Sequence, residues 1–319
     1  MAGYPTAVSA ATLTPGVYMS VDLTAGASSP GVGDLLVLLL CPKASSGDLV
    51  AQSEIRAGGG AESAAVAFGS GTPGHLMAKQ IYAQSPGAQV YFGAPTAGAG
   101  AAVKTITFSG APAANIAVEF TLGDTSLEVA WLAAETADTF KARAIIAINN
   151  LSDAIPITAS SGGVGLVTLT AKVPGNLGND YRVRATIQTA SGTAASDTAA
   201  LANLVGGTTD PDYTTILTAA AALEFQYICI ATSNADAQAG GASNPARLAS
   251  HIAAYNTGLA AKLQQGIFAS TGSQALAKTG AVARDVGYMQ ASFCLNGRGL
   301  PCQLAARECG GRLAAVSLD

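Results

Sequence analysis

One glycine-rich segment has the spacing of a nucleotide-binding loop. Gly69-Ser70-Gly71-Thr72-Pro73-Gly74 satisfies the pattern G-x-G-x-x-G and precedes a segment with helical spacing, which is the context of a dinucleotide-binding turn. However, the next acidic residue is Glu119, far beyond the roughly 20 residues at which a ribose-binding carboxylate is expected. Pro73 also removes an amide that a pyrophosphate would use. The loop is therefore predicted to be structural, and a nucleotide-dependent oxidoreductase stays open as an alternative.

The other residue types that support catalysis form no motif. The chain has no G-x-x-x-x-G-K-[ST] loop, no G-x-S-x-G turn and no H-E-x-x-H. His75 and His251 stand apart from other ligand-type residues, so structural or surface roles are favoured for both. Asp210 and Asp212 flank Pro211, where capping of a helix explains them. We therefore expect no catalytic residue, no cofactor and no metal ligand.

The five cysteines favour packing over chemistry. Cys41 and Cys229 lie in apolar, strand-like runs and are expected to be buried. Cys294, Cys302 and Cys309 have spacings that match no C-x₂-C zinc pattern. A disulfide among these three is left open. The odd count and an N-terminus without a secretory signal favour assembly in a reducing cytoplasm.

The composition excludes several classes of protein. Sixteen Lys and Arg against 20 Asp and Glu give a net charge of −4, so neither nucleic acid nor an anionic membrane is an expected partner. Hydrophobic residues make up 49% and charged residues 11% of the chain, which opposes disorder. The longest clean apolar run, 35–41, is far shorter than the ~20 residues of a membrane span. A surface this poor in charge suits a chain that lies against neighbours.

Two stretches of the chain alternate between apolar runs and helical spacing. Strands are expected at 35–41, 89–92, 225–231, 266–270 and 288–295. Helices are expected at 75–84, 211–223, 244–264 and 274–285, and from Pro301 onward. Asp210 and Asn244, each followed by proline, are expected to cap two of these helices. The alternation predicts an α/β core domain with a mainly parallel sheet and helices on both faces, built from residues 34–102 and 207–319.

Residues 103–206 follow a different pattern. Short alternating strands are expected at 105–109, 115–122, 125–131, 166–173 and 181–189, with a helix capped by Thr136. Turn-forming stretches at 93–100 and 206–210 flank the segment, as a tolerated insertion requires. We therefore expect a small β-rich domain inserted into the core domain.

Residues 1–33 are expected to form an extended N-terminal arm. They are rich in small residues and contain one strand-like segment without a nearby hairpin partner: Val17, Tyr18, Met19, Ser20, Val21, Asp22 and Leu23. Such a strand could add an edge to the sheet of another subunit through backbone hydrogen bonds.

Several motifs, in order along the chain, resemble the contractile tail sheath proteins of Mu-like phages. They are Thr14-Pro15-Gly16-Val17-Tyr18, Ala67-Phe68-Gly69-Ser70-Gly71, Pro174-Gly175-Asn176-Leu177-Gly178-Asn179-Asp180 and Gly206-Gly207-Thr208 with Asp210-Pro211-Asp212. The third is similar to a family signature in which a threonine-rich strand precedes G-x-x-G-N-D. Members usually continue past Asp319, so the resemblance implies that the last part of the core domain is missing here.

The resemblance implies a structural subunit of a phage virion, assembled in the host cytoplasm. Hexameric rings would stack helically around an inner tube and contract to drive it through the host envelope. The implied partners are further copies of the chain, the tube protein, and terminator and baseplate proteins. A sheath or terminator component of a bacterial contractile injection system is an alternative, as is a β-rich adhesive module on an α/β base.

Overall fold

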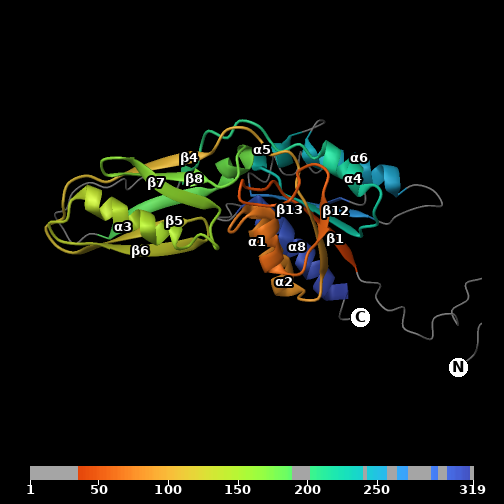
Figure 1. Cartoon of the computed structure of the whole chain (residues 1–319), viewed down its shortest axis with the longest axis horizontal. Helices are drawn as coiled ribbons and strands as arrows, with labels where there is room; N and C mark the ends of the chain where they lie inside the picture. The colour runs from red at the N-terminus through yellow and green to blue at the C-terminus, as the bar shows by residue number, and fades with distance from the viewer. Residues whose placement is uncertain are drawn as a thin grey trace, which may run out of the picture. The chain divides into compact units, whose positions relative to one another are not determined.

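A computed structural model describes residues 35–188, 202–239, 243–256, 264–271, 289–293 and 300–316 (Figure 1). The expected arm, including Val17–Leu23, and the helix expected at 274–285 lie outside these residues. We call residues 35–102 and 207–316 the core domain and residues 103–206 the insert.

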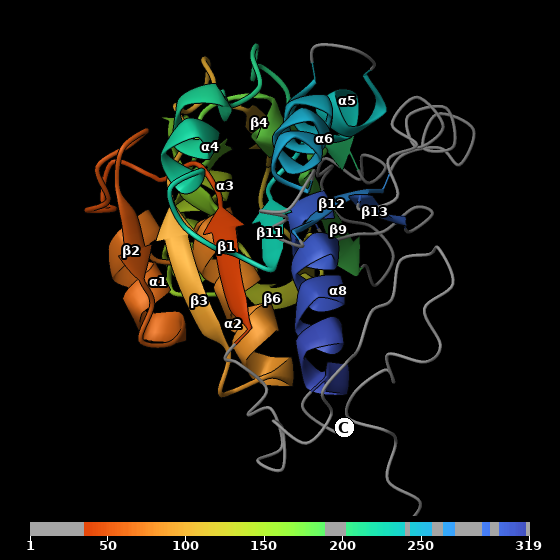
Figure 2. The same ribbon diagram turned by 90° about the vertical axis from the view of Figure 1, so that its right-hand side faces the viewer.

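A six-stranded sheet forms the centre of the core domain, in the order β13-β12-β11-β1-β3-β2 (Figure 2). Its strands are β1 (Leu36–Leu40), β2 (Ile55–Ala57), β3 (Gln89–Gly93), β11 (Tyr227–Ile230), β12 (Gln265–Ser270) and β13 (Met289–Phe293). Neighbouring strands are parallel, except that β2 runs antiparallel to β3.

Strand β1 explains why helices cover both faces of this sheet. Its residues Val37–Leu40 are fully buried, and successive side chains of a strand point to opposite faces. Val37 and Leu39 pack in one buried cluster, and Leu38 and Leu40 in another. The continuous apolar run in the sequence is the consequence of this two-sided burial.

Helices α1 (Ala61–Phe68), α2 (Pro73–Gln84) and α8 (Pro301–Val316) supply the cluster on one face. Helices α4 (Thr214–Ala220) and α6 (Asn244–Tyr255) supply the cluster on the other face, beside the short α5 (Asn234–Gln238). Figure 2 shows α2 and α8 next to each other. Their close approach uses Gly310, where a Cβ would lie 3.2 Å from the backbone of Ile81.

Several helix boundaries differ from the sequence-based expectation. Helix α4 begins at Thr214 rather than at Pro211, because Asp212 Oδ1 accepts from the amide of Thr214 at 3.0 Å while Asp210 bonds elsewhere. Helix α6 is capped by Ser243, whose hydroxyl accepts from Ala246 N, and not by Asn244. Helix α6 also ends at Tyr255, well before residue 264.

Helix α1 was not among the helices expected from the sequence. Its sequence, AESAAVAF, consists mainly of alanine and other strong helix formers. The glycines at 58–60, immediately before it, obscured that signal.

Two antiparallel sheets build the insert, in the orders β10-β9-β5-β6 and β4-β8-β7. Their strands are β4 (Val103–Thr107), β5 (Ile116–Leu122), β6 (Thr125–Trp131), β7 (Ile157–Gly163), β8 (Leu166–Ala171), β9 (Arg182–Gln188) and β10 (Ala202–Asn203). Helix α3 (Ala137–Asn149) is capped, as expected, by Thr136, whose side chain accepts from Thr139 N. An aromatic cluster fills the interior, where Trp131 stacks on Phe140 with ring centroids 4.7 Å apart.

The insert is not separated from the core domain as an independent unit. Leu35–Asp319 form one compact unit. One buried cluster also runs from Phe68 and Met77 of the core domain to Phe120 and Trp131 of the insert. The core domain and the insert are therefore joined by continuous buried packing.

Candidate functional site at the joint between the core domain and the insert

Both chain crossings between the core domain and the insert pass beside the segment 174–180. The amide of Gly175 donates to the carbonyl of Gly100 in the outgoing crossing at 2.7 Å. The amide of Asn176 donates to the carbonyl of Thr209 in the returning crossing at 2.9 Å. The segment therefore ties the two crossings together through its backbone.

This three-way contact requires glycine. A Cβ at Gly98 would lie 2.1 Å from Thr209 O, and one at Gly207 would lie 2.2 Å from Gly175 O. Gly175 itself has φ = +105°, and its Cβ would lie 2.7 Å from Thr209 O. Side chains do not fit at these separations, and the positive φ adds strain for any other residue.

Two asparagines of the short 3₁₀ helix η3 (Asn176–Asp180) extend the joint with side-chain bonds. Asn179 Nδ2 donates to Gly207 O at 2.9 Å, and Asn179 Oδ1 accepts from Gly207 N at 3.0 Å. This side-chain amide thus pairs with a backbone amide as a neighbouring strand would. Asn176 Nδ2 donates to Asp210 Oδ2 at 3.0 Å.

Asp180 joins η3 to the carboxyl end of the core sheet. Its Oδ2 accepts from Asn234 N at 2.7 Å and its Oδ1 from Asn234 Nδ2 at 3.0 Å. Asn234 Oδ1 in turn accepts from Thr271 N at 2.7 Å, immediately after β12. Burial raises the pKa of Asp180 to about 6 against the opposing effect of the Asn234 donors, and the charge of Asp210 raises it further.

After β1 the chain continues to β3 on one side of the sheet, and after β11 it continues to β12 on the other side. In doubly wound sheets, ligands bind at the carboxyl ends of two neighbouring strands of this kind. Tyr213 fills this place. Its side chain is fully buried, and its hydroxyl donates to Ala231 O at 2.6 Å. The position that would receive a cofactor is thus occupied by the chain's own side chain.

The glycine loop 69–74 makes a second contact with the insert. The amide of Gly71 donates to His75 Nδ1 at 2.9 Å, and a Cβ on Gly71 would lie 1.8 Å from Ser152 O. Thr72 caps α2 by accepting from His75 N. The Gly71 amide, which a phosphate would need as a donor, is therefore bonded to His75. The space beside Gly71 is occupied by Ser152 of the insert.

Lys172 of the insert also binds this loop. Its Nζ donates to Ser70 O at 2.9 Å and to Ser152 O. Burial lowers the pKa of Lys172 to about 8, and the carboxylate of Asp153 acts in the opposite direction. Asp153 itself accepts from Ser70 Oγ.

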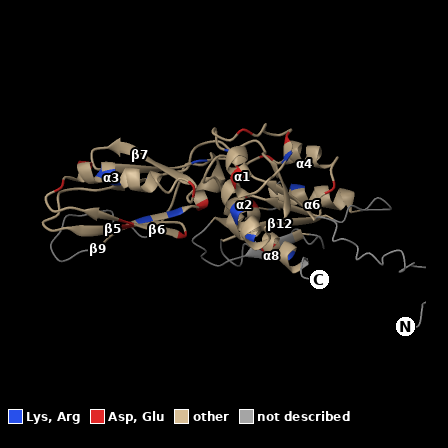
Figure 3. Ribbon diagram, turned by 60° about the horizontal axis from the view of Figure 1, so that its bottom comes forward, with Lys and Arg blue, Asp and Glu red and all other residues tan. Residues whose placement is uncertain are grey.

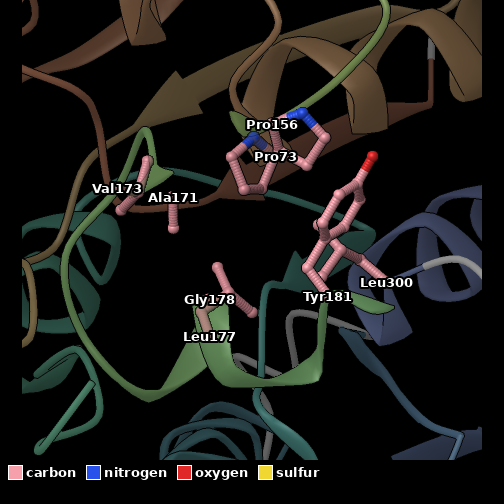
Figure 4. A pocket seen from close by; sticks show the side chains of 8 residues that line it. All are labelled: Pro73, Pro156, Ala171, Val173, Leu177, Gly178, Tyr181 and Leu300. Atoms are coloured by element: carbon pink, nitrogen blue, oxygen red, sulfur yellow. The ribbon is translucent and has the colours of Figure 1, made fainter. Parts of the chain in front are cut away.

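An apolar contact around a small pocket also joins the core domain to the insert (Figure 4). Pro73 and Leu300 of the core domain face six residues of the insert: Pro156, Ala171, Val173, Leu177, Gly178 and Tyr181. The Tyr181 hydroxyl donates to Leu122 O at 2.8 Å, so this buried ring has a polar partner. The three contacts together form what we call the joint.

The other residues singled out from the sequence form no metal-binding group with one another within the described residues. His251 lies on α6 in a groove that Arg247 also lines. Cys41, Cys229, Cys302 and Cys309 are buried free thiols, and Cys294 lies outside the described residues. Burial raises the pKa of Cys302 to about 12. Val17, Tyr18, Met19, Ser20, Val21, Asp22 and Leu23 also lie outside the described residues.

The described ranges contain neither a metal-binding group of side chains nor a membrane-spanning helix. There, no group of three or more His, Cys, Asp or Glu side chains has an arrangement that could hold a metal ion. No helix in the same ranges is long and apolar enough to cross a bilayer. Charged residues are sparse along the ribbon (Figure 3).

Sequence reasoning identified the segment 174–180 but not its task. Asn234 received no role at all, and Asp210 was expected to cap a helix, whereas it accepts from Asn176 and from Ser233 Oγ at 2.6 Å. The available signal was the close spacing of amide and carboxylate side chains with glycines. Such residues satisfy backbone groups where chain segments cross.

The chain has only a low similarity to known proteins. No protein-family model matches it, and no curated protein matches it. Among solved structures, the chain is similar to a sheath tail protein from Listeria innocua, with a TM-score of 0.35 and 12% sequence identity. The match covers 88% of this chain and 56% of that protein, so the chain spans a little over half of that length. A TM-score below 0.5 assigns neither a family nor a function.

Proposed function

We propose that this chain is a structural subunit of a contractile tail sheath and not an enzyme. The observation that carries the proposal is the joint itself. Three segments whose sequences resemble sheath proteins, at 67–71, 174–180 and 206–212, all take part in joining the core domain to the insert. Because these three segments meet where the two parts of the chain are joined, they fit a protein that transmits force between its parts.

The proposal assigns the linking role to the arm. The strand-like residues Val17–Leu23 of one subunit would add to the core sheet of the next. Within the described residues, β2 and β13 end that sheet. Strand β2 has only three residues, and its Arg56 is ion-paired with Glu54 and Asp48. Short, charged edges disfavour strand addition, so β13 is the better acceptor.

Head-to-tail contacts of this kind build helical filaments, because they do not close on themselves. Rings of six subunits would surround an inner tube, and baseplate and terminator proteins would contact the ends of the stack in the phage tail. Contraction would draw on energy stored in a metastable extended lattice, since no nucleotide is proposed to bind. Each subunit would move as a rigid body between two packings, which requires a joint that does not yield.

Assembly of the purified chain tests the proposal. We expect tubes that sediment rapidly without added nucleotide or metal. Val21→Pro should abolish them, because proline removes a backbone donor from the linking strand. Ala27→Pro is the matched control, since it places the same residue in the small-residue stretch beyond the strand, and it should assemble normally.

Two results would contradict this account. Tubes of normal stability from the Val21→Pro chain would refute strand exchange between subunits. A chain that stays monomeric but gains thermal stability on addition of NAD would instead favour the oxidoreductase alternative.

A further inference from the structure

Four cysteines lie together in the buried core between helix α8 and the central sheet. Cys229 belongs to β11, Cys41 directly follows β1, and Cys302 and Cys309 belong to α8. All four side chains are fully buried in the same cluster, on the face of the sheet that α8 covers. Their thiols are free, so the cluster holds nucleophilic groups to which the proposed function gives no task.

Distance excludes a link within the helix and a link within the sheet. A disulfide requires two Cα atoms that lie within ~7 Å of each other. Cys302 and Cys309 are two turns apart on one helix, so their Cα atoms are about 10 Å apart. Cys229 lies opposite Leu39 in the parallel register, two residues before the level of Cys41, which makes Cys229 and Cys41 about 8 Å apart. A link in this cluster must therefore join the helix to the sheet.

One of the helix-to-sheet pairs is in direct contact. Helix α8 packs against β11 (Figure 2), and the thiols of Cys229 and Cys309 are hydrogen-bonded to each other. Cys302 acts on Cys229 and on Cys41 electrostatically. The sulfur of Cys302 accepts from the backbone amide of Gln303. Cys229 and Cys309 are therefore the pair that is positioned to bond.

We propose that Cys229 and Cys309 are an oxidation site, at which a peroxide converts the two thiols to a disulfide that fastens α8 to the core sheet. One sulfur attacks an oxygen of hydrogen peroxide, the O–O bond breaks, and the leaving hydroxide takes the thiol proton to form water. The other sulfur then displaces the hydroxyl group of this sulfenic acid as the S–S bond forms, and its proton leaves in the second water. The two sulfurs lose two electrons, and the peroxide gains them. The proposal is independent of the sheath assignment, because it concerns the single chain.

Access to the pair sets the rate of this reaction. Both side chains are fully buried. The hydrogen bond with Cys309 and burial also raise the pKa of the Cys229 thiol, whereas the thiolate is the form that attacks an oxidant. Oxidation therefore requires a transient separation of α8 from the sheet, and the S–S bond forms when α8 closes again. We expect the reaction to be slow in buffer and faster in urea below the unfolding transition.

Peptide mapping identifies the bond, because trypsin, which cleaves after Lys and Arg, places the five cysteines in five different peptides. The full chain is treated with hydrogen peroxide, in buffer and in urea below the transition. Remaining thiols are then blocked, and the chain is digested without reductant. We expect mass spectrometry to find peptide 308–312, which contains Cys309, linked to peptide 185–247, which contains Cys229. Dithiothreitol should separate the two peptides.

Two variants complete the test. Cys309→Ala removes one partner and should leave peptide 185–247 unlinked, whereas Cys302→Ala, the matched control on α8, should keep the link. Oxidation should raise the urea midpoint of the wild-type chain and of Cys302→Ala but not of Cys309→Ala, because the link restricts the unfolded chain. Absence of the linked peptides from the oxidised wild-type chain, in buffer and in urea, would overturn the proposal even if a variant did not fold. A link between peptides 308–312 and 299–307, which contains Cys302, would overturn it as well.

Discussion

Replacement of Gly175 by alanine tests how tightly the joint is built. Its φ of +105° is unfavourable for a residue with a Cβ, and the added atom would lie 2.7 Å from Thr209 O and 2.8 Å from Gly98 Cα. The backbone conformation alone costs on the order of 1–3 kcal/mol. Because both neighbours are backbone atoms, relief of the clash must move the two crossings apart. We expect Gly175→Ala to lower the free energy of unfolding by about 3 kcal/mol in total.

Alanine substitutions at three other glycines separate the cost of the positive φ from the cost of the close contact. Gly98→Ala introduces only the close contact, 2.1 Å from Thr209 O, since Gly98 has no positive φ. Gly206→Ala introduces chiefly the φ of +107°, because the nearest atom would lie 3.0 Å away. Gly87→Ala introduces neither and should stay within about 0.5 kcal/mol of the wild type.

Urea titration followed by two signals provides the assay. The chain has one tryptophan, Trp131, which is buried in the insert, so its fluorescence reports unfolding of the insert. Circular dichroism reports the whole chain. Both midpoints should fall in Gly175→Ala, and the two curves should separate as the insert is released from the core domain. If Gly175→Ala were as stable as Gly87→Ala, the reasoning about the joint would be wrong.

Two further substitutions test the two parts on either side of the joint. Tyr213→Phe removes a buried hydroxyl that donates to Ala231 O, so it should lower the free energy of unfolding, measured by urea titration, by about 1–2 kcal/mol. No measurable loss would contradict the role assigned to this hydroxyl. Trp131→Ala empties the centre of an aromatic cluster that includes Phe108 and Phe140. It should lower the free energy of unfolding, measured by circular dichroism, by about 3–5 kcal/mol. A loss below about 1 kcal/mol would show that the cluster does not hold the insert together.

Strands and helix caps with strong local signals could be predicted from the sequence. The apolar run at 35–41 is found as β1, and Thr136 caps α3 as expected. Helix α1 was missed because its apolar content is mostly alanine, which marks neither face of the helix clearly. The start of α4 was misplaced because Asp210, followed by Pro211, matches a capping signal, but its carboxylate is committed to Asn176 and Ser233.

The joint could be predicted only in part, for a physical reason. Its segments are far apart in the sequence, and the separations that make Gly98, Gly175 and Gly207 necessary arise only once the chain has folded. A glycine in a glycine-rich chain does not reveal which backbone will approach it. The same holds for the loop 69–74, whose spacing matches a phosphate-binding turn but whose Gly71 packs against Ser152.

Electron cryomicroscopy of the assembled chain tests the central claim most directly. The account predicts hollow, striated tubes in which residues 17–23 of one subunit pair with an edge strand of the core sheet in a neighbouring subunit. A dispersed monomer under all assembly conditions would contradict the account. So would tubes in which residues 17–23 pair within the sheet of their own subunit.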